Sequence, residues 1–307
     1  MNQQEIDKIL QDCTLCPRNC HVNRSMGKTG YCGMDSTVRA ARAALHMWEE
    51  PCISGKKGSG AVFFTGCGLR CCFCQNRDIA IGKSGLEIST ERLAEIFMEL
   101  QEKGAANINL VTGVHNVPQI IRALEIARGQ GMSLPVVYNS SGYEKVETLR
   151  MLKGYVDVYL PDFKYAEKEL AGRYSHAEDY PEIAGRAIEE MVSQTGSVIL
   201  GKDGYIQRGT VVRHLILPGH TRNSVEVLRY LSETYKNDIY ISIMNQYTPV
   251  YEQKENPELN RKVTKREYNK VLDAALKMGI ENGFFQDGKT AEESFIPAFD
   301  YEGIVRE

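Results

Sequence analysis

The chain has 307 residues, of which 42% are hydrophobic and 25% are charged, and its formal net charge is −3. This composition is typical of a soluble globular protein with one large domain and a small appendage, and the absence of a basic block argues against a nucleic-acid partner or an anionic membrane surface. No apolar run approaches the roughly 18 residues of a membrane-spanning helix, and the polar start MNQQEIDKIL does not resemble a signal peptide, so we expect a cytoplasmic protein.

Residues 1–35 contain the first of two cysteine sets. Cys13, Cys16, Cys20 and Cys32 have the spacing C-x2-C-x3-C, with a fourth cysteine after eleven further residues, which is enough for a closed four-ligand metal site. Nine cysteines in a chain without a signal peptide favour metal ligation over disulfides. A segment this small and polar cannot fold around a core of its own, so a metal would have to hold it. Structural zinc, a second four-iron cluster and unliganded thiols are the alternatives.

Residues 36–59 are expected to form a linker. The stretch HMWEEPCISG contains His46, Glu49 and Glu50, and two adjacent carboxylates before a proline are typical of a solvated surface. Because adjacent residues do not share a face of a helix or strand, only one of the two could easily enter a site. The glycine-rich GKKGSG that follows lacks the order and spacing of a phosphate-binding loop.

The stretch AVFFTGCGLRCCFCQN, residues 61–76, is the most informative in the chain. An apolar run that predicts a strand leads directly into Cys67, Cys71 and Cys74, spaced C-x3-C-x2-C. Three thiolates leave one iron of a four-iron cluster without a protein ligand, and an open coordination position is what a catalytic metal requires. Cys72 lies out of phase with this spacing and is expected to be a packed thiol.

After this loop, short apolar runs alternate with helical patterns as far as the C-terminal region. Strands are predicted at 61–65, 108–111, 135–138, 156–160, 210–217, 239–244 and 283–286. Helices are predicted around 93–100 with a cap at Ser89 or Thr90, around 117–124 after Asn116, at 144–152, at 166–194 with a break near Tyr180-Pro181, at 224–235, and at 264–278 with a Thr264–Glu267 capping box.

This alternation predicts parallel βαβ units. Six to seven strands are too few for a closed eightfold barrel, so we expect an α/β fold built as a partial, open (β/α)6-type barrel. The expected division is a cysteine-rich segment at 1–35, a linker at 36–59, a core at 60–290 and a tail at 291–307.

Polar residues follow most of the predicted strands, at the edge where parallel α/β folds place their chemistry. They are Gly113 and His115 after the second strand, Asn139 after the third, Asp162 and Lys164 after the fourth, Arg213 within the fifth, and Asn245 or Gln246 after the sixth. Each also has a plain structural explanation, such as a surface ion pair for Asp162 and Lys164 or a packed histidine for His115.

The cysteine loop and these strand ends resemble the radical S-adenosylmethionine (SAM) superfamily. The tail CxFCQN, with Phe73 before the last cysteine, is similar to the pyruvate formate-lyase activating enzyme branch and to an uncharacterised iron–sulfur subgroup of it. The resemblance implies that Cys67, Cys71 and Cys74 hold a [4Fe–4S] cluster, that SAM binds the open iron, and that reduced cluster cleaves SAM to a 5′-deoxyadenosyl radical for hydrogen abstraction.

The same resemblance implies which residues contact SAM. Gly113 stands where the family has Gly-Gly-Glu, although the glutamate is missing, and Asn139 stands in place of the acid in Asp-Thr-Asn-Gly. Asp162 and Lys164 match Asp-x-Lys, and Asn245 occupies the place of a ribose-contacting residue. Arg213 would bind the SAM carboxylate, because a guanidinium donates two parallel hydrogen bonds.

The implied function is a radical SAM oxidoreductase that activates a glycyl-radical enzyme or modifies a peptide, with a small metabolite as a further possible substrate. Its electron donor would be a flavodoxin or ferredoxin. The alternative is a non-enzymatic iron–sulfur electron carrier or a zinc-stabilised interaction domain. A carrier would need neither Arg213 nor the pair Asp162 and Lys164, and some 230 residues of βαβ pattern exceed what holding two clusters requires.

Overall fold

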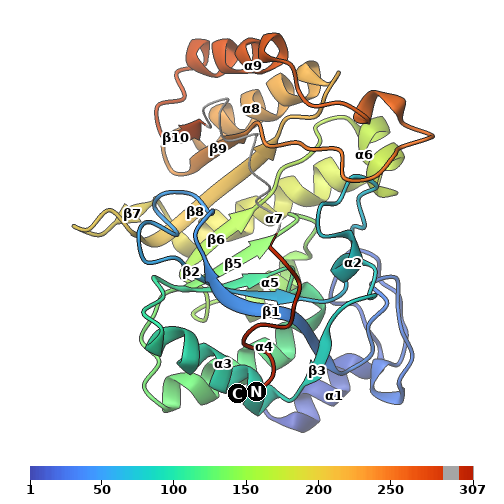
Figure 1. Ribbon diagram of the computed structural model, residues 1–307, viewed down its shortest axis with the longest axis vertical. Helices are drawn as coiled ribbons and strands as arrows, with labels where there is room; N and C mark the ends of the chain where they lie inside the picture. The colour runs from blue at the N-terminus through green and yellow to red at the C-terminus, as the bar shows by residue number, and fades with distance from the viewer. Residues whose placement is uncertain (286–296, 307) are drawn as a thin grey trace.

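The computed structural model describes residues 1–285 and 297–306. Within them one ten-stranded sheet runs in the order β10-β9-β8-β6-β5-β4-β2-β1-β3, with β7 paired to β8 (Figure 1). The strands are β1 (Val38–His46), β2 (Ser59–Phe64), β3 (Leu86–Ile88), β4 (Ile108–Val111), β5 (Val136–Ser140), β6 (Val158–Pro161), β7 (Ile199–Leu200), β8 (Ile206–Leu215), β9 (Tyr240–Met244) and β10 (Gly283–Phe285).

Seven of these strands form the parallel body of the sheet. Strands β2, β4, β5, β6, β8, β9 and β10 pair in parallel with their neighbours, whereas β1 pairs antiparallel with β2 and β3 antiparallel with β1. In the part of the chain that is described, the outer strands β3 and β10 do not pair with each other, so the sheet stays open. The prediction of a partial, open α/β barrel is therefore confirmed.

The helices follow the predicted pattern closely. They are α1 (Gln3–Gln11), α2 (Arg77–Ala80), α3 (Thr90–Glu102), α4 (Val117–Gly129), α5 (Val146–Met151), α6 (Lys168–Ser175), α7 (Tyr180–Thr195), α8 (Thr221–Tyr235) and α9 (Lys265–Lys277), with 3₁₀ turns η1 (Arg24–Met26), η2 (Val114–Asn116) and η3 (Pro257–Leu259). Ser89 caps α3 by accepting from the Arg92 N–H, and the Thr264–Glu267 capping box opens α9.

Side chains alternate between the two faces of the parallel strands, as period-two backbone geometry requires. On the outer face, Leu110 and Tyr138 pack with helices α3, α4 and α7 in one core, and Val212 and Ile241 pack with α7, α8 and α9 in another. The residues that alternate with these along each strand face the inside of the barrel. Both faces are thus covered, as parallel sheets require.

The interior of the open barrel is partly filled by the chain between β1 and β2. Cys52 and Ile53, both buried, pack against Val137, Val158 and Leu160 on the inner face. The Ile206 N–H donates to the Cys52 carbonyl at 2.8 Å, and the Asn107 amide donates to the Ile53 carbonyl at 2.9 Å. We call residues 47–58 the floor loop, because they close one end of the barrel.

The stretch expected to be a linker, 36–59, thus contains β1 and the floor loop, neither of which the sequence pattern predicted. Helices α1 and α2 and strands β3 and β7 were also not predicted, and β8 and α8 begin several residues before their predicted starts. For α2, β3 and β7, which have four residues or fewer, the reason is that short elements are stabilised by what they pack against, which local periodicity does not contain.

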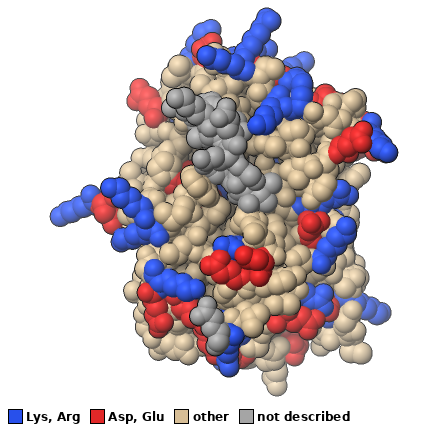
Figure 2. All heavy atoms as spheres, viewed as in Figure 1, with Lys and Arg blue, Asp and Glu red and all other residues tan. Residues whose placement is uncertain are grey.

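The C-terminal residues run along β1. The Ala43 N–H donates to the Glu302 carbonyl at 2.8 Å, and the Tyr301 N–H donates to the Ala41 carbonyl at 3.1 Å. Positions 286–290 of the predicted core and 291–296 and 307 of the predicted tail lie outside the described residues. Every helix in the described ranges is too short or too polar to cross a lipid bilayer. Basic and acidic side chains are interspersed over the face drawn in Figure 2.

The floor loop generates a prediction about stability. Ile53→Ala should lower the free energy of unfolding by about 2–5 kcal/mol, because a fully buried side chain is replaced by a cavity. Chemical denaturation followed by circular dichroism measures the change. Lys56→Ala, at an exposed position of the same loop, is the control and should change stability by less than about 0.5 kcal/mol. Equal effects of the two substitutions would contradict a packed floor loop.

Candidate functional site

One cavity lies inside the barrel at the carboxyl ends of the strands. It brings together seven of the residues predicted from the sequence, namely Cys67, Cys71, Cys74, Asn139, Asp162, Lys164 and Arg213. The two other residues predicted to bind cofactor, Gly113 and Asn245, are not among its lining residues. Their neighbours Thr112 and Gln246 line it instead.

Arg213 is the centre of a buried hydrogen-bond network in this cavity. Its Nε donates to Asp162 Oδ1 at 3.1 Å, its Nη1 to Glu49 Oε2 at 3.1 Å, and its Nη2 to Asn139 Oδ1 at 2.6 Å. The two carboxylates outweigh the opposing effect of burial and raise the pKa of Arg213. A guanidinium has five N–H donors. These three bonds use one hydrogen on each nitrogen and leave one on each terminal nitrogen.

Lys164 joins this network to the cysteines. Its Nζ donates to Asp162 Oδ2 at 2.6 Å. Burial opposes ionisation of Asp162, but Lys164 and Arg213 outweigh it and hold the pKa of this carboxyl below its usual range. Lys164 also exerts an electrostatic effect on the Cys71 and Cys74 thiols. Lys164 is therefore paired with Asp162 and close enough to two of the three cysteines to affect their pKa values.

Glu49 and Glu50 correct an expectation, because neither lies on the solvated surface. The Glu49 side chain is 9% exposed and lines the cavity. Besides its ion pair with Arg213, Glu49 accepts from the amides of Asn109 and Asn139, each at 3.1 Å. Glu50 is buried, and burial raises its pKa, with Arg213 opposing the rise and Glu49 adding to it. The floor loop thus places one ion-paired carboxylate in the site, followed in the chain by a buried carboxyl with a raised pKa.

The backbone at the strand ends has two conformational constraints. Thr112, directly after β4, has φ of +60°, an unfavourable conformation for a β-branched residue that costs of order 1–3 kcal/mol. Gly142, after β5, has φ of +76°, and a Cβ there would lie 2.2 Å from the Asp162 carbonyl oxygen. Only glycine fits this position. Both constraints lie where the chain turns away from the cavity.

The three cysteines after β2 lie in the irregular segment between β2 and α2. Burial raises the pKa of Cys71, and it raises the pKa of Cys74 to about 12. Since ligands must be thiolates, a metal would have to displace these protons. This set of three half-buried thiols near Lys164 fits a metal cluster. Among the described residues, no three His, Cys, Asp or Glu side chains already stand as a metal-binding group, so the ligand assignments remain predictions.

Cys72 differs from its neighbours, as its spacing predicted. It does not line the cavity. Its N–H donates to the Tyr174 carbonyl at 2.8 Å, and its side chain packs with the core around Tyr174 and Tyr247. His115 is likewise a packed residue, since its Nε2 lies 2.7 Å from the Thr65 carbonyl oxygen and burial lowers its pKa to about 3.

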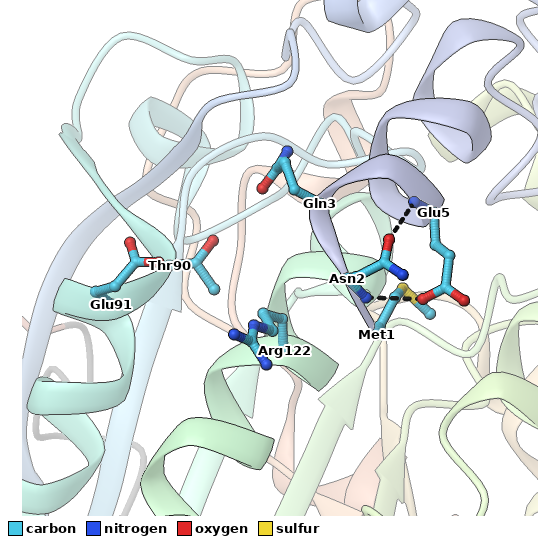
Figure 3. Close-up of a pocket in the computed structure, with 7 residues that line it drawn as sticks. All are labelled: Met1, Asn2, Gln3, Glu5, Thr90, Glu91 and Arg122. Carbon is cyan, nitrogen blue, oxygen red and sulfur yellow. Dashed lines mark hydrogen bonds between the residues drawn. The ribbon is translucent and has the colours of Figure 1, made fainter.

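A second hollow lies away from this cavity, between the start of α1, the start of α3 and helix α4. Figure 3 shows it with the reciprocal hydrogen bonds between Asn2 and Glu5 that cap α1. Its lining residues are Met1, Asn2, Gln3, Glu5, Thr90, Glu91 and Arg122, and none of them is a cysteine or histidine. The cavity at the strand ends is the better candidate site, because it alone of the two combines thiols with paired charges.

Sequence analysis missed Glu49, Thr112 and His46 as cavity residues. His46 meets Phe63 edge to face at a centroid distance of 5.9 Å, and burial with nearby Arg42 and Arg213 lowers the pKa of His46 to about 4. One signal was available. Asn109 is a polar residue in the middle of the apolar run INLV, which indicates that the inner face of β4 meets a polar partner.

Two comparisons with known proteins identify the family of the chain. The family model for the Radical SAM superfamily matches residues 61–231, more than half of the chain. The uncharacterized protein MJ0674 of Methanocaldococcus jannaschii is 31% identical over 281 residues, which are 89% of this chain and 77% of that protein.

Two crystal structures of Streptococcus suis SuiB, one bound to S-adenosylmethionine, are also similar. The SAM-bound structure has a TM-score of 0.46 and 13% identity over 74% of this chain and 50% of SuiB. The other has a TM-score of 0.45 and 12% identity over 72% of this chain and 47% of SuiB. The chain thus spans about half the length of the SuiB structures.

The different environments of Glu49 and Glu50 predict different effects of the same substitution on the free energy of unfolding. Glu49→Gln removes a charged partner of Arg213 and should lower the free energy of unfolding by about 1–3 kcal/mol. Glu50→Gln mimics the carboxyl that stays protonated in the folded state, so it should be nearly neutral at pH 4.5.

The pH dependence gives the decisive comparison. A raised pKa means that folded Glu50 keeps its proton above pH 4.5, the ordinary glutamate value, while unfolded Glu50 loses it. The wild-type chain therefore loses stability as pH rises above this value, and Glu50→Gln should gain an increasing advantage. Denaturation curves at several pH values test this. Identical pH profiles of stability for the wild-type chain and Glu50→Gln would contradict a raised pKa of Glu50.

Proposed function

The chain belongs to the radical SAM superfamily, and from this premise we propose that it is an activating enzyme that removes a hydrogen atom from a glycine of a polypeptide. Membership implies an enzyme with a [4Fe–4S] cluster and SAM as cofactors. The alternative of a non-enzymatic electron carrier or zinc domain accordingly loses its support.

The observation that carries the proposal is that Cys67, Cys71 and Cys74 share one cavity with the charged network of Arg213. These cysteines would hold the cluster. The bound cluster would supply the electron for reductive cleavage of SAM and so provide the radical chemistry for hydrogen abstraction. The protein need not supply a separate acid or base for this, since cofactors carry the difficult chemistry and the protein positions them.

The residues around the cluster have the donors and acceptors that SAM requires. The remaining N–H groups of Arg213 suit the SAM carboxylate, because a guanidinium can donate two bonds to one carboxylate. Asp162 and Glu49 offer carboxylates to its ammonium group, and Glu49 thereby provides the acid that is missing after Gly113. Asn139 and Gln246 offer amides to the ribose hydroxyls. Lys164 adds a fixed positive charge on the cluster side of Asp162.

The proposal of a polypeptide substrate rests on the edge of the cavity. Trp48, which is 56% exposed, lines it together with His46 and Pro297. A large, partly exposed aromatic ring beside an open barrel suits contact with an extended peptide. We further propose that a reduced flavodoxin or ferredoxin of the cytoplasm delivers the electron.

SAM cleavage is the first test of this function. The anaerobically reconstituted, reduced protein should release 5′-deoxyadenosine from SAM, and SAM should change the EPR spectrum of the cluster. Cys71→Ala should abolish cleavage. Arg213→Lys should weaken SAM binding more than cluster assembly, by at least tenfold, because lysine has no planar fork. Cys72→Ala is the matched control and should keep both. An unaltered spectrum without cleavage would overturn the proposal.

The substrate class is tested by isotope transfer. Glycine-centred heptapeptides with deuterium at the α-carbon should pass deuterium into 5′-deoxyadenosine, and alanine-centred peptides should not. Transfer supports glycine hydrogen abstraction. Cleavage of SAM at an unchanged rate, with no deuterium from any peptide, would leave the family assignment intact and reject the activating-enzyme proposal.

A further inference from the structure

The N-terminal cysteine segment packs directly on the loop that contains Cys67, Cys71 and Cys74. Arg18 lies at the contact. Its Nε donates to the Gly68 carbonyl at 2.8 Å, its Nη2 to the Ser175 carbonyl at 3.0 Å and its Nη1 to the His176 carbonyl at 2.6 Å. One side chain thus fixes the backbone of the cysteine loop to the end of α6.

Glycines allow this close approach. Gly66, with φ of +94°, has so little space that a Cβ would lie 2.4 Å from Met34 Cγ and 3.1 Å from the Cys32 carbonyl oxygen. A Cβ on Gly68 would lie 3.4 Å from Cys16 Sγ. Two of the N-terminal cysteines therefore adjoin the backbone on either side of Cys67.

The fold of the segment places its four cysteines near one another, although they do not stand as a finished metal-binding group in the described residues. The Cys13 N–H donates to the Val22 carbonyl and the His21 N–H donates to the Cys13 carbonyl, both at 3.1 Å, which folds the first three cysteines into a hairpin. The Tyr31 N–H donates to Cys20 Sγ at 3.2 Å, next to Cys32. Cys16 is in electrostatic contact with Cys13 and Cys32, and Cys32 with Cys13 and Cys20.

A buried arginine, Arg24, lies beside the N-terminal cysteines and is the second observation. It is fully buried, with 0% of its surface exposed. Its guanidinium donates to the Asp35 carbonyl at 3.0 and 2.5 Å and to the His115 carbonyl at 2.6 Å, and its Nη1 lies 3.9 Å from Cys13 Sγ. No carboxylate of the described residues forms an ion pair with it. A buried cation without an anion costs several kcal/mol, so a negatively charged group beside Arg24 would stabilise it.

We propose that Cys13, Cys16, Cys20 and Cys32 bind one metal centre through four thiolates, either a zinc ion or an iron–sulfur cluster, and that this centre anchors the loop of Cys67, Cys71 and Cys74. Four thiolates outweigh the charge of a zinc ion and leave the centre negative, which compensates Arg24. Four protein ligands close the coordination sphere, as in structural sites. The proposal rests on the N-terminal segment and holds whether or not the protein cleaves SAM.

The N-terminal site is tested by measuring the metal content of a variant that keeps only the N-terminal set of cysteines. The triple variant Cys67→Ala, Cys71→Ala and Cys74→Ala, purified without oxygen, should contain about one zinc, or about four iron and four sulfide, per chain. Cys52→Ala added to this variant is the control and should not change the content. When Cys16→Ser and Cys20→Ser are added to the triple variant in place of Cys52→Ala, the metal should be lost. If the triple variant contains no more metal per chain than this fivefold variant, the proposal is overturned.

Arg24 provides a test that does not depend on cysteine variants. If the centre exists, Arg24→Met should lower metal affinity about 10- to 100-fold in competition with a chromophoric chelator, whereas Arg24→Lys should keep most of it. Both variants disturb the hydrogen bonds of Arg24 to the Asp35 and His115 carbonyls, so metal affinity and not stability is the readout. Equal metal affinity in Arg24→Met, Arg24→Lys and the unchanged chain would reject a role of the Arg24 charge at the centre.

The anchoring role has its own measurement. Arg18→Ala should increase hydrogen exchange at residues 66–72 while leaving the metal content of the triple variant unchanged, because Arg18 contacts Gly68 and is not a ligand. Removal of the metal by chelation should increase exchange over the same residues. Unchanged exchange after metal removal would reject the anchoring role. Because neither readout uses SAM, failure of the proposed function would be seen separately.

Discussion

The candidate site depends on the charge of Arg213, which is buried inside an open sheet. A buried guanidinium is costly unless charged and polar partners surround it. The partners here come from three separate parts of the chain: Glu49 from the floor loop, Asn139 from β5 and Asp162 from the end of β6. One charge therefore fixes the relative position of three elements at the edge of the sheet where the cysteine loop also lies.

The open sheet explains why the floor loop exists. In closed eightfold barrels, layers of inward side chains fill the interior. Here the sheet does not close in the described residues, and Cys52 and Ile53 fill the space beneath the strand ends. Because the floor loop fills only one end of the barrel, the end at the carboxyl termini of the strands keeps a cavity. The same loop places Glu49 in that cavity, so it both packs the barrel interior and contributes a residue to the site.

The sequence predicted the regular part of the fold because strands such as β4 and helices such as α3 carry their burial pattern locally. It also predicted most of the cavity, since parallel strands bring their carboxyl ends to one edge. Glu49 was missed because its environment is set by Arg213, 164 residues away along the chain. For the same reason β1 could not be recognised, because its partners are β2 and the C-terminal residues.

The two cysteine sets are best understood by their different coordination needs. If Cys67, Cys71 and Cys74 hold the proposed cluster with one iron open, only three protein ligands fix it, and the loop needs support from other contacts. Supporting contacts around such a site must keep it within a fraction of an ångström. The segment at residues 13–35 provides these contacts through Arg18 and at Gly66. A closed metal centre can make so small a segment rigid without a large core. Buried Arg24 connects the segment to the barrel, because its guanidinium donates a hydrogen bond to the His115 carbonyl after β4.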